Sequence, residues 1–344
     1  VYKRQVFPLV QIPDVQGGRG RFRADQLTLN NFTGCAGQHI FRGHRLPADF
    51  YGDYIIPEPV GRLVRRAKIT DEDGKLVVSN ATPGTEFMRS RDANFRPVNA
   101  STGPDGCLYI CDMYRGIIQE GNWVRPGSYL RGVVENYGLD KNIGRGRIYR
   151  VVHESTRRGK RPQMLSAPSP ELVSHLSHAN GWWRDTAQKL IVVRGDRSVV
   201  PALQALARSG GDARGRMHAL WTLDGLGASD PVLLAEALQD PDPRVRAAAI
   251  RILEPFISSA GDETNQRLAA MVEDPDVDVV IQLILSLGYT GADGSDLLIE
   301  KISTRHGKNP NIQSIIDLYR SRIAEAQRRR LQDRFLGMGE TNYQ

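Results

Sequence analysis

An amphipathic helix recurs through the second half of this chain, and this repeat limits the possible folds more than any other feature. Asp212, Asp242 and Asp276 each precede an apolar helical run, and they lie 30 and 34 residues apart. A second amphipathic helix precedes each of these runs. One helix pair cannot bury its apolar face alone, so recurring pairs stack into a continuous core. The pattern predicts a HEAT-type α-solenoid over residues 170–330.

The first half, up to about residue 152, consists of short alternating runs rich in glycine and β-branched residues, which indicate strands and turns. Residues 52–59, 61–69 and 75–80 read as antiparallel strands, with a hairpin turn at Asp73-Gly74. We interpret this half as about two blades of a β-propeller, interrupted by an insertion at 116–142 that contains a helix. Because propellers close with roughly four to eight blades, further blades are expected upstream of this sequence.

The expected fold class is therefore multidomain β + α, with the C-terminal blades of a β-propeller followed by a HEAT-like α-solenoid. The predicted parts are the partial propeller at 1–153, a basic and then Pro- and Ser-rich linker at 154–169, the helical repeats at 170–330 and a tail at 331–344.

Composition excludes several classes of function. The net charge is +7, but the basic clusters at 19–23, 62–68, 157–161 and 328–330 are interleaved with acidic residues and lack stacking aromatics. We interpret them as solvated surface, so no nucleic-acid partner is expected. No run of eighteen apolar residues predicts a transmembrane segment. The sequence opens on a strand-like phrase without a signal-peptide pattern, and we interpret it as an internal piece of a longer protein.

Polar side chains near the end of one predicted strand form the candidate site, because propellers bind ligands around their central channel. Asp112, Tyr114 and Arg115 end that strand, and Arg96 and Asn99 lie in the segment before it. Arg115 could clamp a carbonyl or a carboxylate. The alternative is structural, with an ion pair between blades for Asp112 and Arg115 and loop anchoring for Arg96 and Asn99. The catalytic residues are unknown and no metal ligands are predicted.

Other chemically active residues have a structural interpretation beside a functional one. Glu58 lies between two prolines and could bind a metal or a sugar hydroxyl, or it could cap a loop. Cys35 lies in a Gly-Cys-Ala-Gly turn without a visible activating base. His218 and Trp221 lie at helical spacing, which favours packing between repeats.

Several phrases resemble one known family. They are FRPVNASTGPDGCLYICDMYRGIIQEGNW at 95–123, with further stretches at 12–47, 58–68, 139–152 and 178–190. The chain resembles the middle portion of predicted membrane-bound dehydrogenases, which have a glucose/sorbosone-dehydrogenase-like β-propeller, HEAT-type repeats and a C-terminal c-type haem domain with a CxxCH motif. That motif is absent from these 344 residues.

The resemblance implies a fragment of a bacterial periplasmic redox protein. Such a protein would oxidise a sugar or an alcohol and pass electrons to a downstream cytochrome c domain. Pyrroloquinoline quinone (PQQ) and Ca²⁺ would belong to the parent propeller and haem to the parent protein, so this fragment alone is expected to be inactive. The alternative function is a non-catalytic propeller and HEAT-repeat scaffold, with a protein partner on the concave face of the solenoid.

Overall fold

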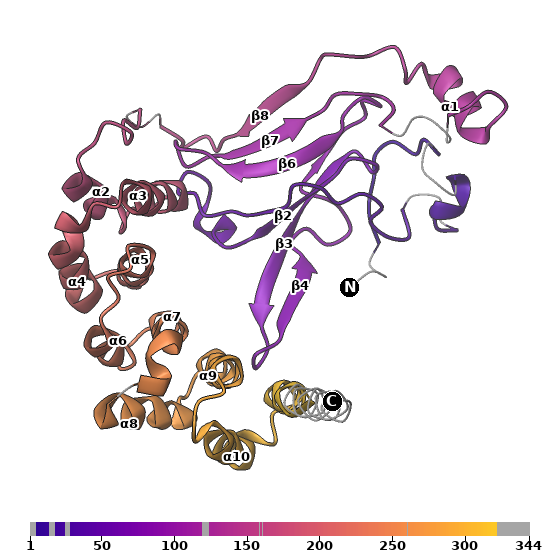
Figure 1. Ribbon diagram of the computed structural model, residues 1–344. Coiled ribbons are helices and arrows are strands. Elements are labelled where there is room, and N and C mark those ends of the chain that lie inside the picture. Colours follow the sequence, from indigo (N-terminus) through magenta and orange to yellow (C-terminus); the bar gives the residue numbers. More distant parts are fainter. Residues whose placement is uncertain are drawn as a thin grey trace, which may run out of the picture. The chain divides into compact units, whose positions relative to one another are not determined.

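The computed structural model describes residues 5–13, 18–24, 28–118, 124–157, 159, 161–259 and 261–321 (Figure 1). The chain divides into two compact units. The first comprises Val1–Thr70, Leu76–Gln163 and Ala179–Trp183, and the second comprises Asp71–Lys75, Met164–His178 and Arg184–Gln344. The basic cluster at 328–330, the predicted tail at 331–344 and part of the predicted insertion lie outside the described residues.

The first unit contains two antiparallel sheets. One sheet has the order β1-β2-β3-β4, and β5 also pairs with β3. The second sheet has the order β6-β7-β8. The strand bounds are β1 His39–Ile40, β2 Tyr54–Glu58, β3 Leu63–Asp71, β4 Leu76–Asn80, β5 Met88–Arg89, β6 Pro97–Thr102, β7 Leu108–Asp112 and β8 Arg147–Val151. Two 3₁₀ turns, η1 Gly18–Arg21 and η2 Ala48–Phe50, lie in the connections.

The prediction of propeller blades is wrong. A blade is a four-stranded meander, whereas here β3 pairs with three other strands and the second sheet has three strands. The two sheets also share one core, in which Ile55 of β2 and Val64 of β3 are clustered with Leu108 and Ile110 of β7. The described residues therefore form two antiparallel sheets around a common core, with no closed barrel or propeller.

Several local features near the sheets follow from the sequence as expected. Asp73 and Gly74 have φ values of 53° and 84°, as the turn between β3 and β4 requires. Helix α1 (Tyr129–Tyr137) begins at Ser128, whose side chain accepts a hydrogen bond from the amide of Arg131, and ends at Gly138 with a φ of 58°. The predicted helix within the insertion is thus confirmed.

The interpretation of the basic cluster at 62–68 as solvated surface is wrong for its arginines. Arg62, Arg65 and Arg66 are buried. Arg65 Nε donates to Glu86 Oε2 at 2.8 Å, and Arg66 forms an ion pair with buried Asp53. Buried guanidinium groups need such partners, since an unpaired charge is costly to remove from water.

The second unit is a solenoid of helix pairs. Its helices are α2 Ser169–His175, α3 Gly181–Arg194, α4 Val200–Ser209, α5 Ala213–Gly225, α6 Pro231–Ala237, α7 Pro243–Leu253, α8 Asp262–Ala270, α9 Val277–Thr290 and α10 Ser295–His306, and residues 310–321 are also helical. The 3₁₀ turns η4 Arg197–Val199, η5 Glu254–Ser259 and η6 Met271–Glu273 join some of them. Figure 1 shows α5, α7 and α9 in one row, the inner row, and α4, α6, α8 and α10 in the other.

The repeating aspartates act as helix N-caps, as their position before each apolar run suggests. The side chains of Asp212, Asp242 and Asp276 accept hydrogen bonds from the amides two residues further on, at the starts of α5, α7 and α9. Among the described residues, no helix combines the length and the apolar character needed to cross a membrane.

Candidate binding groove on the inner helices

A ladder of largely buried ion pairs holds successive repeats together and positions the inner helices. Arg216 of α5 binds both carboxylate oxygens of Asp240, at 2.6 and 2.7 Å. Arg246 of α7 binds both oxygens of Asp274, at 2.7 Å each. Each guanidinium also donates to a carbonyl oxygen six residues earlier in the chain. These fork-shaped contacts set the spacing and orientation of neighbouring helices.

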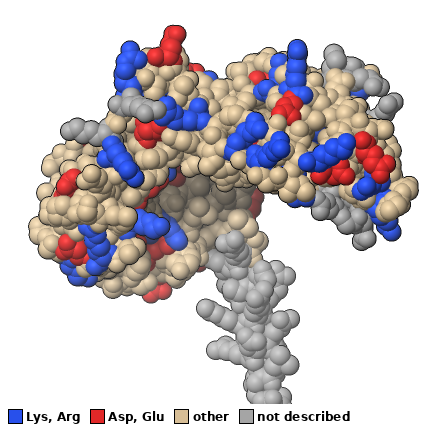
Figure 2. All heavy atoms as spheres, turned by 90° about the horizontal axis from the view of Figure 1, so that it is seen from above, with Lys and Arg blue, Asp and Glu red and all other residues tan. Residues whose placement is uncertain are grey.

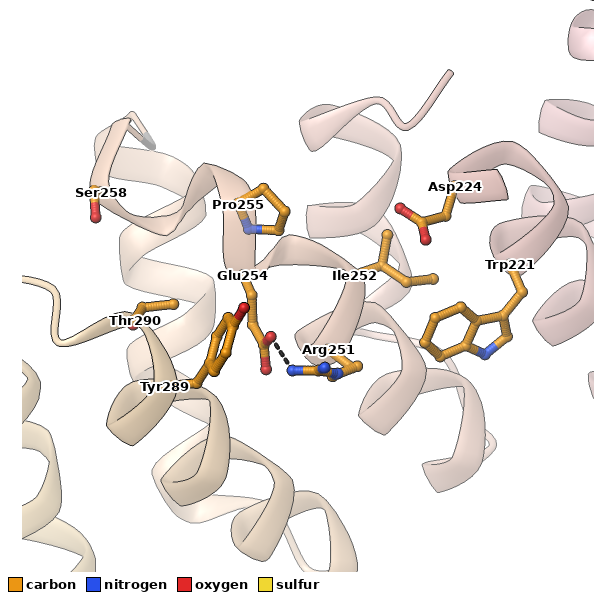
Figure 3. Close-up of a pocket in the computed structure, with 9 residues that line it drawn as sticks. All are labelled: Trp221, Asp224, Arg251, Ile252, Glu254, Pro255, Ser258, Tyr289 and Thr290. Atoms are coloured by element: carbon orange, nitrogen blue, oxygen red, sulfur yellow. Dashed lines mark hydrogen bonds and ion pairs between the residues drawn. The ribbon is translucent and has the colours of Figure 1, made fainter. Parts of the chain in front are cut away.

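The last turns of the inner helices line the larger of two adjoining open cavities, with a volume of about 690 Å³ (Figure 3). Helix α5 contributes Trp221 and Asp224, and α9 contributes Tyr289 and Thr290. The middle of the cavity is lined by Arg251 and Ile252 of α7 and by Glu254, Pro255 and Ser258 of η5.

The smaller cavity, of about 380 Å³, lies between α3 and α5 and shares Trp221 with the larger one. Its other lining residues are Asp185, Gln188, Lys189, Val192 and Gly225. The two helices approach closely here, because a Cβ atom at Gly225 would lie 2.7 Å from Val192 Cγ2. We call the two cavities together the inner groove.

Charged groups in the groove are partly neutralised within the chain. Glu254 is buried, forms an ion pair with Arg251 and accepts a hydrogen bond from Ser286 Oγ at 2.6 Å. The hydrogen bond that Arg251 donates to the Glu254 carboxylate raises the pKa of Arg251, which therefore stays charged. The guanidinium carbon of Arg251 also lies 5.3 Å from the ring centroid of Tyr289, within cation–π range.

The helical spacing of His218 and Trp221 predicts packing between repeats for both. His218 is buried and its Nδ1 lies 2.6 Å from Gln188 Oε1 of the preceding repeat, as predicted. Trp221 is only half-buried and lines both cavities, so its role as a groove residue was missed, as was that of Tyr289. The available signal was that both aromatics fall in the last turn of an inner helix.

The structure brings four of the five predicted site residues together where β7 ends. Asp112 Oδ1 accepts from the amides of Arg96 at 2.7 Å and Tyr114 at 2.8 Å. The buried Arg96 guanidinium donates to the carbonyl oxygens of Pro59, Arg115 and Gly116.

The fifth predicted site residue, Asn99, is exposed on β6 opposite Cys111. Arg96 anchors loops, because its guanidinium donates to the carbonyl oxygens of Pro59, Arg115 and Gly116. With no propeller channel among the described residues, ligand contact at these five positions stays a prediction.

Glu58 and Cys35 belong to a second structural cluster of the first unit. The Glu58 carboxylate accepts from the amides of Thr33, Gly34, Val60 and Gly61, which is the loop-capping role. Cys35 is exposed as a residue, but loss of solvation around its thiol and the nearby Glu58 carboxylate raise its pKa to about 12. This thiol is therefore a poor nucleophile. The described residues bring no group of three or more His, Cys, Asp and Glu side chains together that could hold a metal ion.

The surface charge offers no basic platform on the face that Figure 2 shows, where Lys and Arg alternate with Asp and Glu. The absence of a nucleic-acid partner stays a prediction of the sequence.

Comparison with known proteins supports the repeat architecture. Residues 231–305 match the model of HEAT repeats. The helix pairs, their capping aspartates and this match make the described part of the second unit a HEAT-like solenoid. Residues 1–155 match a family described as a domain of unknown function, DUF7133. Neither description names a dehydrogenase, and no curated protein matches the chain.

Two solved structures are distantly similar. One is the complex of CpcE and CpcF of the phycocyanin lyase from Nostoc sp. PCC7120, at 17% identity over 44% of this chain and 97% of that chain, with a TM-score of 0.37. The other is YibA from Escherichia coli, at 13% identity over 48% of this chain and 99% of that chain, with a TM-score of 0.20.

Proposed function

We propose that this chain is a scaffold for protein–protein interaction and that the inner groove is its binding surface. The observation that carries the proposal is the pair of adjoining cavities that share Trp221, of about 690 and 380 Å³. Solenoids of stacked repeats offer extended surfaces of this kind to their partners.

The composition of the groove supports this function. Trp, Tyr and Arg are the residues enriched at the energetic centres of protein interfaces, and the groove contains Trp221, Tyr289 and Arg251. Tyr289 is 75% exposed, so much of its ring is available for contact.

The dehydrogenase function implied by the family resemblance is the second reading, and no observation on the described residues favours it. Arg96 and Asp112, the most promising candidates for it, hold loops together. A periplasmic location likewise stays a prediction of the resemblance, which fractionation of the source cells would test.

Site-specific photo-crosslinking tests the scaffold function. A benzophenone amino acid replaces Tyr289 in the groove or, as a control, Val232, which is exposed on α6 of the other row. We expect one discrete partner to be captured from extract of the source cells at position 289 and not at position 232. The purified partner should then bind at least tenfold more weakly to the Trp221→Ala variant. Equal capture at both positions, or binding unaffected by Trp221→Ala, would refute the proposal.

A further inference from the structure

The larger cavity of the inner groove lies where three neighbouring helices end. Helices α5, α7 and α9 end at Gly225, Leu253 and Thr290, and each contributes residues of its last turn to the lining. The last carbonyl groups of a helix lack partners within it, and they carry the negative end of the helix dipole. The C-terminal ends of α5 and α9 therefore favour a positively charged occupant of this cavity, whereas α7 continues directly into η5.

The side chains of the groove add to this preference. The lining carboxylates are Asp185, Asp224 and Glu254, and the lining cations are Lys189 and Arg251. Arg251 is already committed to Glu254. Asp224 is exposed, and among the described residues no Lys or Arg forms an ion pair with it, although Ser229 Oγ donates to its Oδ1 at 3.2 Å. A carboxylate is thus available to a ligand cation.

Arg251 indicates the kind of group that the groove accommodates. Figure 3 shows its side chain extending from α7 toward Glu254, on the Tyr289 side of the cavity. The guanidinium thus has a carboxylate partner and an aromatic ring, at 5.3 Å from the ring centroid of Tyr289. Trp221 and Asp224 offer the same combination on the α5 side, three residues apart on one helix face. Arg251 fills the first combination. Among the described residues no salt bridge brings a Lys or Arg to Asp224, which interacts with the Arg251 charge only over a longer distance.

We propose that the inner groove binds a basic segment of a partner protein, with an Arg or Lys side chain held between the Asp224 carboxylate and the Trp221 ring. This inference rests on the proposed scaffold function and adds the chemistry of the partner. Cation–π contact and ion pairing then act together on one side chain.

The test measures binding of a designed probe to the full chain by fluorescence anisotropy. The probe is a fluorescein-labelled Gly/Ser peptide with arginine at every third position, and the comparison peptide carries glutamate instead. We expect the wild-type chain to bind the arginine peptide more tightly than the glutamate peptide. Binding of the arginine peptide should be about fivefold weaker to Asp224→Asn than to the wild type, and it should weaken at high salt. Arg251→Gln should tighten binding at least twofold, because it opens Glu254 and Tyr289 to the probe. The control Arg305→Gln removes the same charge from an exposed side chain of α10, outside the groove, and should change binding less.

Each other outcome overturns the inference in a distinguishable way. Preference for the glutamate peptide, lost in Trp221→Ala, would mean that the groove docks an acidic partner, and the scaffold function would survive. Binding of the arginine peptide that neither Asp224→Asn nor Arg251→Gln alters would place the basic segment elsewhere. If neither peptide binds, but Trp221→Ala still weakens binding of the photo-crosslinked partner, the basic-segment inference is wrong and the scaffold function stands. If Trp221→Ala does not weaken binding of that partner either, both proposals are wrong. Melting curves of each variant separate these outcomes from loss of fold.

Discussion

Replacing Arg246 by glutamine should destabilise the solenoid far more than the same change at Arg244, two residues earlier on α7. The Arg246 side chain is 11% exposed and donates to both oxygens of Asp274, which is 3% exposed. It also donates to the carbonyl oxygen of Asp240 at 2.8 Å. The Arg244 side chain is 65% exposed and pairs with Asp242 at the surface end of the helix.

The expected loss of stability depends on which interactions remain after each substitution. Without Arg246, the buried Asp274 carboxylate keeps only the amide of Asp276 among its described hydrogen bonds. Removing one partner of a buried ion pair costs about 3 kcal/mol. That loss corresponds to a fall in melting temperature of roughly 6–12 °C for a domain of this size. An exposed pair contributes at most about 1 kcal/mol, so Arg244→Gln should lower the melting temperature by roughly 4 °C or less.

Thermal unfolding followed by circular dichroism at the helical band measures both variants, because the described helices lie mostly in the second unit. The double variant Arg246→Gln/Asp274→Asn should recover much of the lost stability, since it removes the uncompensated charge as well. The reasoning is refuted if Arg246→Gln is no more destabilising than Arg244→Gln, or if the double variant is as unstable as the sum of its single changes.

Two further predictions concern ionisable groups of the first unit. The pKa of Cys35 is raised to about 12. The rate of its alkylation by iodoacetamide should therefore keep rising about tenfold per pH unit from about pH 8 to 10. A plateau in this rate at about pH 9 would contradict the prediction. The control Glu58→Gln, which removes a nearby negative charge, should react faster. Burial raises the pKa of Asp112, whose Oδ2 has no hydrogen-bond partner among the described residues. Stability of the wild type should therefore fall as pH rises from the unfolded-state pKa of about 4 to the higher folded-state pKa. In urea unfolding, Asp112→Asn should be at least as stable as the wild type at neutral pH, and its stability should not fall over that acidic pH range. A variant less stable than the wild type at neutral pH would contradict the prediction.

The solenoid could be predicted because its determinants are local in sequence. A capping aspartate, an apolar face of helical period and a short turn recur in each unit, and all three act over a few residues. The individual strands β2, β3 and β4 and the turn at Asp73-Gly74 were predictable for the same reason.

The arrangement of those strands was not predictable in this way. β7 pairs with β8 across the intervening residues 113–146, and β2 shares a core with β7. Strand alternation specifies which side chains are buried, but it does not specify which strands meet. The propeller interpretation failed at that step. The buried state of Arg66 likewise depends on Asp53, a partner that only the folded chain brings into contact.

The sequence by itself determined the helix pairs, their caps and the short strands, since each depends on neighbours along the chain. Only the tertiary structure decided the packing of the two sheets and the composition of the inner groove. Trp221, Arg251 and Tyr289 lie about one repeat apart in sequence, and stacking of the repeats lines one groove with them. A surface assembled from successive repeats has no contiguous signature in sequence, because its residues become neighbours only when the apolar faces stack.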